Sequence, residues 1–417
     1  MKILHTVEFY NPSVGGMQEV VRQISEKLIL LGHSVTVATS YDENRKKNEL
    51  NGVQIQSFRL KGNDVRGYQA LEGEIRRYQD FIINSQFDVI TIFAAQQWSA
   101  DLILPLLKNI KSRKIFVPTG FSGLFNPEYR NYFENMKTYM KYFDMNVFLS
   151  DDYRDINFAR ENGIEKRTLI PNGAGEDEFL ARQEINIRRN LGIREDCFLI
   201  LHVGSHTGLK GHDEMFKIFQ KAKINNSVLL IVGNYFKSET PLLKKIIKFL
   251  INLFIFHETG FNRCPESCRS AERKFNLKSV NKRAEKKIII KELTRKETVA
   301  AYQSADLFLF PSNIECSPIV LFEAAASETP FLTSNAGNSE EIVSWLGGGI
   351  LLPTVTDRLG YGRVRIEKSV KILEELFFNN ELRNKLGTNG YKNWKNGFSW
   401  EIIAKKYEKL YQDLMKE

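Results

Sequence analysis

The sequence contains little of what secreted or membrane-spanning proteins usually carry. It has four cysteines among 417 residues, and its N-terminal segment turns polar after one short apolar run instead of forming a secretion signal. We therefore expect reduced thiols and no disulfide framework. The longest mainly apolar run, residues 246–256, contains Lys248 and is shorter than the roughly 20 residues of a bilayer-spanning helix. These absences predict a cytoplasmic protein.

Sequence motifs for two kinds of cofactor are also absent. No G-x-G-x-x-G fingerprint occurs, which argues against an NAD-dependent enzyme. No D-x-D sequence occurs either, so the usual carboxylate ligands of a metal-bound nucleotide sugar are missing. Cys264 and Cys268 lie close in the sequence but have too few partners to indicate a zinc site. We therefore expect no metal cofactor.

Positive charge is concentrated in one segment. The formal net charge is +9, and residues 235–287 hold 13 Lys and Arg against 5 Asp and Glu, so the rest of the chain is almost neutral. This distribution argues against a nucleic-acid-binding protein, whose basic residues spread along a face. The sequence predicts instead one basic insert, residues 235–287.

The insert combines two patterns. Residues 242–256 have a basic side and a broad apolar side, as an interfacial helix has, although a core-packed helix with exposed lysines fits equally well. The following polar stretch, residues 267–287, is expected to form a surface subdomain or mobile loop. Our hypothesis is that residues 241–287 provide peripheral contact with an anionic membrane, at the inner face of the plasma membrane, or with a lipid-diphosphate acceptor.

Buried-strand patterns alternate with helical patterns along the chain, which is typical of α/β folds with parallel sheets. The predicted strands are residues 2–7, 33–40, 88–93, 114–118, 145–150, 198–204, 227–233, 286–291, 306–312, 330–334 and 348–353. We predict two Rossmann-like domains, residues 1–175 and 176–398, with ligands bound in a cleft beyond the carboxyl ends of their strands. A last helix, within residues 399–417, is expected to cross back to the first domain.

Each half opens with a strand, a glycine-containing loop and an amphipathic helix. Gly15 and Gly16 precede the first of these helices, where bare backbone lets a ligand approach the N–H groups of the helix end, although a simple tight turn fits as well. Lys210 and Gly211 occupy the equivalent loop of the second half. A lysine there can meet a phosphate, but an exposed surface lysine is the more ordinary interpretation.

Two glutamates, Glu315 and Glu323, lie eight residues apart after the predicted strand 306–312. Between them, Ser317 is a good N-cap and Pro318 suits the first position of a helix that runs to about Ala326. The helix N–H groups would favour an anion, whereas the carboxylates would repel phosphate and accept hydrogen bonds from sugar hydroxyls. A helix end flanked by two carboxylates therefore indicates a nucleotide-sugar site.

The stretch ADLFLFPSNIECSPIVLFEAAASETPFLTSNAGNSEEI resembles the donor-site signature of the family 4 glycosyltransferases, which are retaining enzymes of the GT-B fold. The resemblance extends to NPSVGGMQEVVRQISEKLILLGHSVTVAT, RTLIPNGAGEDEF, HVGSHTGLKGH and FSWEIIAKKY, and so covers most of the chain. It implies that Lys210 and Glu315 are the catalytic residues. The donor-binding residues that it implies, together with these two, are Gly15, Gly16, Asn172, Ser205, Lys291, Glu292, Leu293, Ser317, Pro318, Ile319, Val320 and Glu323.

The resemblance also assigns parts of the donor. Glu315 would hold hydroxyls of the sugar and Glu323 those of the ribose. Lys210, Gly16 and the amides of residues 318–320 would hold the diphosphate, the backbone of residues 291–293 would flank the base, and Asn172 would line the cleft.

Two positions depart from the family pattern. Ser205 stands where the family usually has an arginine, so a second cation at the diphosphate is missing unless His206 or another residue supplies it. Thr119 stands where a histidine often contacts the donor sugar, and Gln96 and Gln97 offer polar contacts instead. Since Lys210 and the helix end remain, these changes are expected to slow such an enzyme and not to abolish its activity.

The sequence therefore predicts a retaining, metal-independent hexosyltransferase. It would move a sugar from a UDP- or GDP-sugar to a glycan or polyprenyl-diphosphate-linked acceptor, in the synthesis of a surface polysaccharide or lipopolysaccharide. Two alternatives stay open: a donor-binding or assembly subunit with impaired catalysis, and a sugar-nucleotide epimerase on the same fold.

Overall fold

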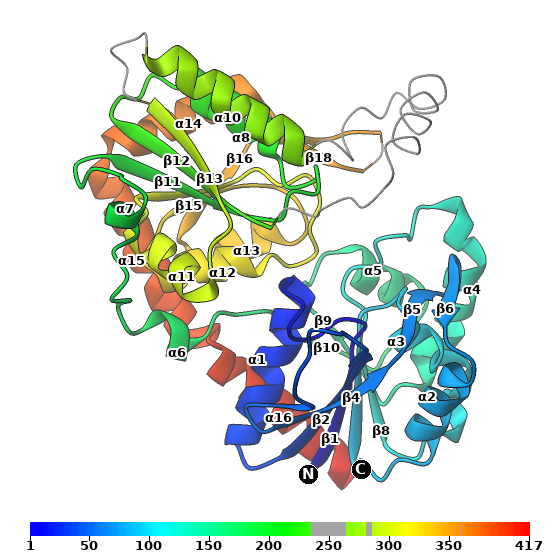
Figure 1. Cartoon of the computed structure of the whole chain (residues 1–417). Helices are drawn as coiled ribbons and strands as arrows, with labels where there is room; N and C mark the ends of the chain where they lie inside the picture. Colours follow the sequence, from blue (N-terminus) through cyan, green and yellow to red (C-terminus); the bar gives the residue numbers. More distant parts are fainter. Residues whose placement is uncertain (235–263, 281–285, 359) are drawn as a thin grey trace. The chain divides into compact units, whose positions relative to one another are not determined.

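The computed structural model of the chain describes residues 1–234, 264–280, 286–358 and 360–417. It divides into two units (Figure 1). The first unit comprises Met1–Gly175, Cys316–Ile319 and Gly397–Glu417, and the second comprises Glu176–Glu315 and Val320–Asn396. The chain therefore returns to the first unit twice, the second time with its C-terminal segment.

The first unit is built on a sheet whose central strands are continuous apolar runs. In spatial order its strands are β10 (Arg167–Leu169), β9 (Met145–Phe148), β8 (Arg113–Val117), β7 (Val89–Phe93), β1 (Lys2–Thr6), β2 (Ser34–Ser40), β4 (Val53–Phe58) and β3 (Glu49–Leu50). Every pairing is parallel except that of β3 with β4. A separate antiparallel hairpin joins β5 (Leu60–Asn63) and β6 (Gly67–Ala70). Parallel strands buried on both faces explain the apolar runs.

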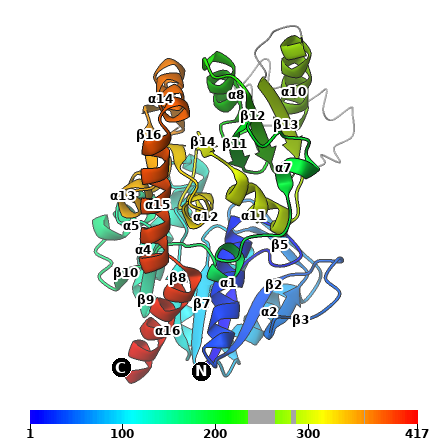
Figure 2. The same ribbon diagram turned by 90° about the vertical axis from the view of Figure 1, so that its left-hand side faces the viewer.

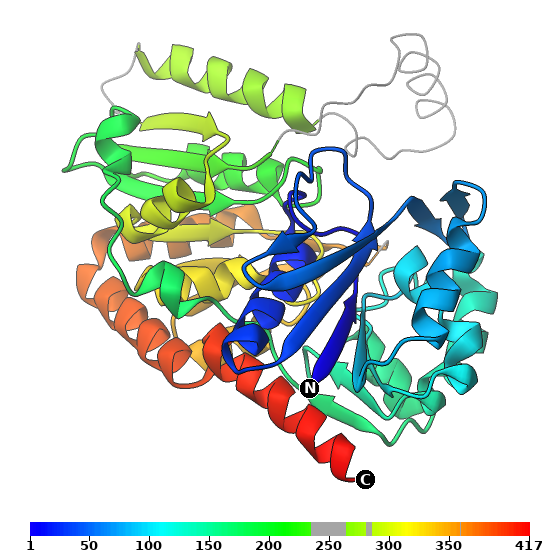
Figure 3. The ribbon, with the colours of Figure 1, turned by 60° about the horizontal axis from the view of Figure 1, so that its bottom comes forward.

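Helices cover both faces of this sheet. They are α1 (Gly16–Leu30), α2 (Glu74–Ile83), α3 (Trp98–Asp101), η1 (Leu104–Asn109), η2 (Pro127–Tyr129), α4 (Arg130–Tyr139), η3 (Met140–Tyr142), α5 (Arg154–Glu161) and α16 (Trp400–Lys416). Adjacent residues of β1 point to opposite faces, as in any strand. Ile3 joins a cluster with residues of α1 and α16, which lie side by side (Figures 2 and 3). Leu4 joins a cluster with residues of α2 to α5.

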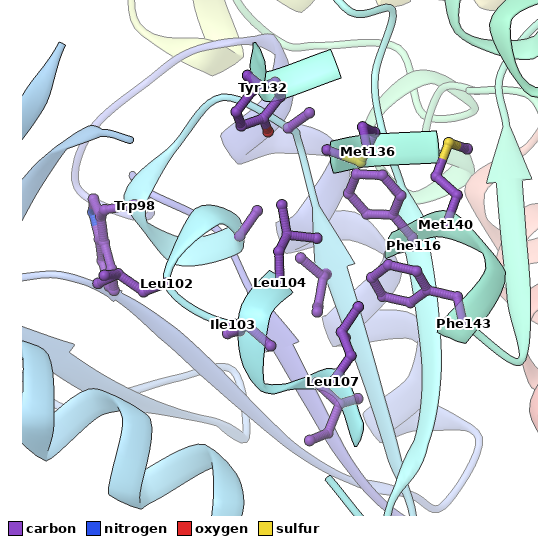
Figure 4. Packing of buried hydrophobic residues seen from close by; sticks show 14 of the residues in the cluster. Trp98, Leu102, Ile103, Leu104, Leu107, Phe116, Tyr132, Met136, Met140 and Phe143 are labelled. Carbon is purple, nitrogen blue, oxygen red and sulfur yellow. The ribbon is translucent and has the colours of Figure 1, made fainter. Parts of the chain in front are cut away.

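The second of these clusters is rich in aromatic and aliphatic side chains. Figure 4 shows part of this cluster, including Trp98 from α3, Leu104 from η1, Phe116 from β8 and Met136 from α4. Phe116 stacks on Phe143 with ring centroids 4.9 Å apart and an interplanar angle of 13°. This packing fixes the positions of the helices that the loops of the first unit connect to its strands.

The second unit is built on a fully parallel sheet. In spatial order its strands are β13 (Lys286–Lys291), β12 (Ser227–Val232), β11 (Phe198–Val203), β14 (Leu307–Phe310), β15 (Phe331–Ser334) and β16 (Gly349–Leu352), and β17 (Thr354–Thr356) pairs with β18 (Gly362–Val364) separately. Its helices are α6 (Glu176–Phe179), α7 (Ile187–Asn190), α8 (His212–Lys221), α10 (Cys264–Val280), α11 (Arg295–Ser304), α12 (Ile319–Ala326), α13 (Ser339–Leu346), α14 (Ile366–Phe378) and α15 (Asn380–Gly397). The predicted pair of Rossmann-like sheets is confirmed.

Every strand predicted from the sequence is present within one or two residues of its predicted ends. The prediction missed β4, in which Gln54 and Gln56 alternate with apolar residues, and the short strands β3, β5, β6, β10, β17 and β18. The predicted C-terminal helix is α16, which belongs to the first unit.

The prediction for residues 267–287 was wrong in part. Residues 264–280 form α10, which lies against β13 at the edge of the sheet (Figure 1). The side chain of Asn276 bonds both backbone groups of Ile288, at 2.9 and 3.0 Å, and Glu272 accepts from the N–H of Ile290 at 3.1 Å. Because an edge strand exposes unpaired backbone groups, polar residues of α10 have a structural use that composition alone did not indicate.

The predicted interfacial helix, residues 242–256, lies outside the described residues, as does most of the segment expected to contact a membrane. Within the part of the chain that the structure describes, no helix combines the length and the apolar character needed to cross a bilayer.

A buried hydrogen-bond network links α16 to the first sheet and generates a stability prediction. The hydroxyl of Tyr411 lies 2.7 Å from the Thr91 hydroxyl and 3.3 Å from Nε2 of His5, and Nδ1 of His5 lies 2.8 Å from the Ser25 hydroxyl. Burial lowers the pKa of His5 to about 3, so the ring is neutral at pH 7. Tyr411→Phe should lower the free energy of unfolding by about 1–3 kcal/mol, because it leaves buried partners unsatisfied.

The matched control is Tyr407→Phe on the same helix, measured by the same urea titration at pH 7. The Tyr407 hydroxyl is equally buried but has no hydrogen-bond partner among the described residues, so its removal should change stability little. Equal losses in both variants would show that the network does not contribute.

Candidate functional site

The loops that follow β11 and β14 meet where the strand order of the second sheet reverses. In the order β13-β12-β11-β14-β15-β16, the first strand of the unit lies beside the fourth (Figure 2). Open parallel sheets form a crevice at such a reversal, beyond the carboxyl ends of the strands, and ligands bind there. The loop after β11 contains Lys210 and the loop after β14 contains Glu315. The topology therefore brings together the two residues predicted to be catalytic.

An ion pair joins these two side chains. Nζ of Lys210 lies 2.6 Å from Oε1 of Glu315, and the Ser312 hydroxyl donates to the same oxygen at 2.7 Å. The Glu315 side chain is 11% exposed and that of Lys210 is 26% exposed, so water screens the pair only in part. The sequence assigns these residues to different parts of a donor. The structure adds that each partly neutralises the charge of the other.

The loop that carries Lys210 is fastened to the loop after β14. The carbonyl of Leu209 accepts a hydrogen bond from the N–H of Asn313 at 2.8 Å. Gly211 has a φ of +67°, and a Cβ built there would lie 1.8 Å from the carbonyl oxygen of Pro311. Both the backbone conformation and the close approach therefore require glycine next to the lysine.

Glu323 is buried in α12 and forms an ion pair that the sequence did not predict. Its side chain is 3% exposed, and its Oε1 lies 2.6 Å from a guanidinium nitrogen of Arg295, the first residue of α11. Arg295 also lies 2.7 Å from a carboxylate oxygen of Glu178. A carboxylate has about four acceptor positions, so this pair is compatible with a ribose contact. The sequence does show that Arg295 directly follows Thr294, a helix N-cap. No sequence pattern indicates that Glu323 is the ion-pair partner of Arg295.

The other predicted donor residues of the second unit also lie at this edge of the sheet. Ser205 is in the loop after β11, Lys291 ends β13, and Glu292 and Leu293 connect β13 to α11. Val320 is in the first turn of α12. The side chains of Lys291 and Glu292 are exposed. Recognition of the base by this segment remains a prediction.

The start of α12 differs from the prediction. The helix begins at Ile319, one residue after Pro318, and the buried Ser317 hydroxyl has no hydrogen-bond partner within the described part of the chain. Ser317 is therefore not a side-chain cap. Its carbonyl oxygen accepts a hydrogen bond from the side-chain amide of Asn172 at 2.9 Å, within the first unit. A tertiary contact to the backbone thus fixes this segment where local capping was expected. Asn172, predicted to line a cleft, supplies that contact.

The first sheet has the same reversal of strand order, between β1 and β7. Gly15 and Gly16 lie on the loop after β1, and Gly15 is extended with a φ of −176°. A Cβ built at Gly16 would meet no atom within 4 Å. No atom of the described residues therefore requires glycine at position 16, and the open space is consistent with the predicted approach of a ligand.

Gln96 and Gln97, predicted to supply polar contacts, use their side-chain oxygens within the first unit. Gln96 accepts from the N–H of Gly123 at 3.1 Å, and Gln97 accepts from the N–H of Glu8 at 3.2 Å. Gln96 and Thr119 both have a φ of +61°. Such sparsely populated conformations persist where the surroundings impose them and are frequent at functional sites.

A buried carboxylate holds the loop where the resemblance expected a histidine. The N–H of Gly120, next to Thr119, donates to Asp155 at 2.8 Å. Burial raises the pKa of Asp155 to about 6, although hydrogen bonds from Gly120 and Ile156 oppose this shift. Asp155 was missed by the sequence analysis because nothing local indicates that it reaches residue 120.

Comparison with known sequences gives one family and two full-length relatives. The sequence model of the family "Glycosyl transferases group 1" matches residues 183–393. An uncharacterized glycosyltransferase of Methanocaldococcus jannaschii is 25% identical over 435 aligned residues, which cover 100% of this chain and 99% of that protein. The alpha-monoglucosyldiacylglycerol synthase of Acholeplasma laidlawii is 22% identical, with coverage of 98% and 96%.

Solved structures give the same fold. Sucrose-phosphate synthase from Thermosynechococcus elongatus has a TM-score of 0.73 at 17% identity, covering 100% of this chain and 99% of that one. HepE of Anabaena, solved in complex with UDP-glucose, has a TM-score of 0.69 at 13% identity, with coverage of 99% and 100%. Identities this low concern the fold alone, and the predicted GT-B fold is confirmed.

The fit around Gly211 predicts a large cost for the smallest possible side chain. Gly211→Ala should lower the free energy of unfolding by about 1–2 kcal/mol for the left-handed backbone. A further cost of about 1–3 kcal/mol should come from the clash with Pro311. Differential scanning fluorimetry and urea unfolding would measure the loss.

Gly192→Ala in the same unit is the control for the backbone term. Gly192 has a φ of +64°, but a Cβ built there meets nothing within 4 Å, so only the conformational cost should remain. If the two variants lost the same stability, the close approach to Pro311 would not be a constraint.

Proposed function

We propose, since this chain belongs to the group 1 family of glycosyl transferases, that it is a retaining hexosyltransferase of family 4 that uses a nucleotide-diphosphate sugar. The observation that carries the proposal is the Lys210–Glu315 ion pair at the reversal of strand order, followed within α12 by Glu323. A lysine and two carboxylates at this edge suit a ligand with a diphosphate and two sets of hydroxyls.

Each residue has a role that follows from its chemistry. Lys210 stabilises the negative charge that develops on the departing diphosphate, and the N–H groups at the start of α12 add to this stabilisation. Glu315 accepts hydrogen bonds from the sugar. Glu323 does the same for the ribose, while Arg295 neutralises its buried charge. The lysine and the backbone amides provide positive charge without a metal, so we propose metal-independent transfer.

The acceptor step needs no additional protein nucleophile. The acceptor hydroxyl attacks the face that the leaving group departs from, and the departing phosphate oxygen removes its proton. This mechanism retains the anomeric configuration, and the bond from sugar to phosphate breaks as the bond to the acceptor forms. The proposed acceptor is a glycan or a lipid-linked glycan of the cell surface, because a glycolipid synthase is among the full-length relatives.

The choice of base is tested by ligand-induced stabilisation. HepE of Anabaena was solved with UDP-glucose, which favours UDP as the first nucleotide to test. We expect UDP and UDP-sugars to raise the melting temperature of the purified chain, and GDP to leave it unchanged. A shift with GDP compounds alone would reverse the assignment of the base.

Lys210→Ala tests catalysis. With UDP-sugars as donors, slow release of UDP by hydrolysis should fall about 10²–10³-fold in kcat, the usual effect of removing one preorganised donor. Lys217→Ala is the control, since Lys217 is an exposed lysine on α8.

NMR of the products distinguishes a transferase from the two alternatives, an epimerase and a donor-binding subunit. An epimerase would give a new nucleotide sugar without net UDP release, and a binding subunit would bind donor without turnover.

The two glutamates should give different binding profiles in calorimetry. Glu323→Ala should weaken binding of both UDP and UDP-sugar, because the ribose is common to them. Glu315→Ala should weaken binding of the UDP-sugar mainly, by about 10–100-fold, the usual value of a hydrogen bond to a charged group. Equal losses for both ligands in both variants would contradict this division of roles.

A further inference from the structure

Three buried side chains outside the predicted donor contacts gather in the second unit. His206 lies in the loop after β11, His212 is the first residue of α8, and Cys268 lies in α10. One imidazole nitrogen from each histidine and the Cys268 sulfur all lie within 4.8 Å of one another. His206 and His212 are 3% exposed and Cys268 is fully buried. Far apart in the sequence, these residues converge because α8 and α10 pack on the same sheet.

The donor set is that of a transition-metal site. Two imidazoles and a thiolate suit Zn²⁺, which prefers nitrogen and sulfur ligands in tetrahedral geometry. Bond lengths of about 2.0–2.1 Å to nitrogen and 2.3 Å to sulfur place neighbouring ligand atoms about 3.3–3.6 Å apart. From separations of up to 4.8 Å, the side chains need to close by roughly 1 Å, which rotamer adjustments supply.

His202 lies beside this cluster and carries a further buried imidazole nitrogen. Its Nδ1 lies 2.9 Å from the carbonyl oxygen of Leu309, so this nitrogen carries the proton and Nε2 has a lone pair. Nε2 is buried and has no hydrogen-bond partner among the described residues. The His202 ring centroid is 4.9 Å from that of His212. A carbonyl that orients an imidazole in this way is typical of the outer shell of metal sites.

We propose that His206, His212 and Cys268 bind one Zn²⁺ ion, and that Nε2 of the neighbouring His202 completes the ligand set after side-chain adjustment. The ion would join α10 to the loop of residues 204–211, which carries Lys210. Its role is structural: it holds that loop and closes the insert helix onto the sheet. Any consequence for donor binding rests on the proposed function, whereas the site itself does not.

The simpler alternative is that these side chains fill the core. His206 and His212 stack with centroids 4.6 Å apart and an interplanar angle of 21°, as packed rings do. Core packing predicts no specific affinity for a metal. A metal site predicts one ion per chain, a sulfur ligand and dependence on these positions.

Titration of the whole chain, freed of any purification tag, with Co²⁺ alone distinguishes core packing from a metal site. We expect one Co²⁺ per chain, with the visible absorption of tetrahedral cobalt and a thiolate-to-cobalt charge-transfer band, both abolished by Zn²⁺. Cys268→Ser should remove the charge-transfer band and weaken binding by at least about 10–100-fold, the loss seen even for outer-shell partners. Cys197→Ser changes another buried cysteine of the same unit and should keep both the charge-transfer band and the affinity for Co²⁺.

Zn²⁺ should also slow hydrogen exchange in residues 204–211 and 264–280 of the unaltered protein and of Cys197→Ser, but not of Cys268→Ser. If Cys268→Ser fails to fold, His206→Gln replaces it, with folding checked by circular dichroism. Absence of stoichiometric Co²⁺ binding, or binding that both the Cys268 and His206 variants retain, would overturn the proposal. Neither outcome bears on glycosyl transfer, because no measurement here involves a donor.

Discussion

The close approach of Gly211 to the carbonyl of Pro311 is the constraint on which the second unit's site depends. It joins the loops after β11 and β14 at the reversal of strand order, where no side chain fits between them. Lys210, one residue before, is thereby placed beside Glu315. His212, one residue after, begins α8 beside His206. The proposed donor contacts and the proposed metal site thus share one point of backbone contact.

The charged side chains at this edge pair with one another. Lys210 and Glu315 partly neutralise each other, and Arg295 pairs with both Glu178 and the buried Glu323. An unpaired buried carboxylate would be costly, so these pairs allow the acidic groups to be held where burial removes much of their water. In the proposed function, a diphosphate would share Lys210 with Glu315. Ser205 stands where an arginine was expected. Among the described residues of this loop, Lys210 is therefore the cation that pairs with a carboxylate of the proposed site.

Strands were predictable where burial on both faces made the sequence continuously apolar, as in β7 and β12. β4 was missed because Gln54 and Gln56 interrupt that pattern near the edge of the sheet. α10 was missed because its polar residues bond the edge strand β13, so they resemble a solvated segment. Lys210, Glu315 and Glu323 were predicted to be site residues from local motifs. Arg295, Asp155 and the cluster of His206, His212 and Cys268 were not, since each acts on residues distant in sequence.

The sequence by itself determined the class of fold, the carboxyl-end loops and the motif residues, because periodic burial and short spacings are local properties. Only the tertiary structure decided which charges pair, why position 211 must be glycine and which imidazoles meet a thiol. Ser317 illustrates the difference: it has the composition of a helix cap, yet a contact from Asn172 to its carbonyl fixes the segment and its hydroxyl caps nothing. Pairing across the fold depends on distances set by packing, and packing is a property of the whole unit.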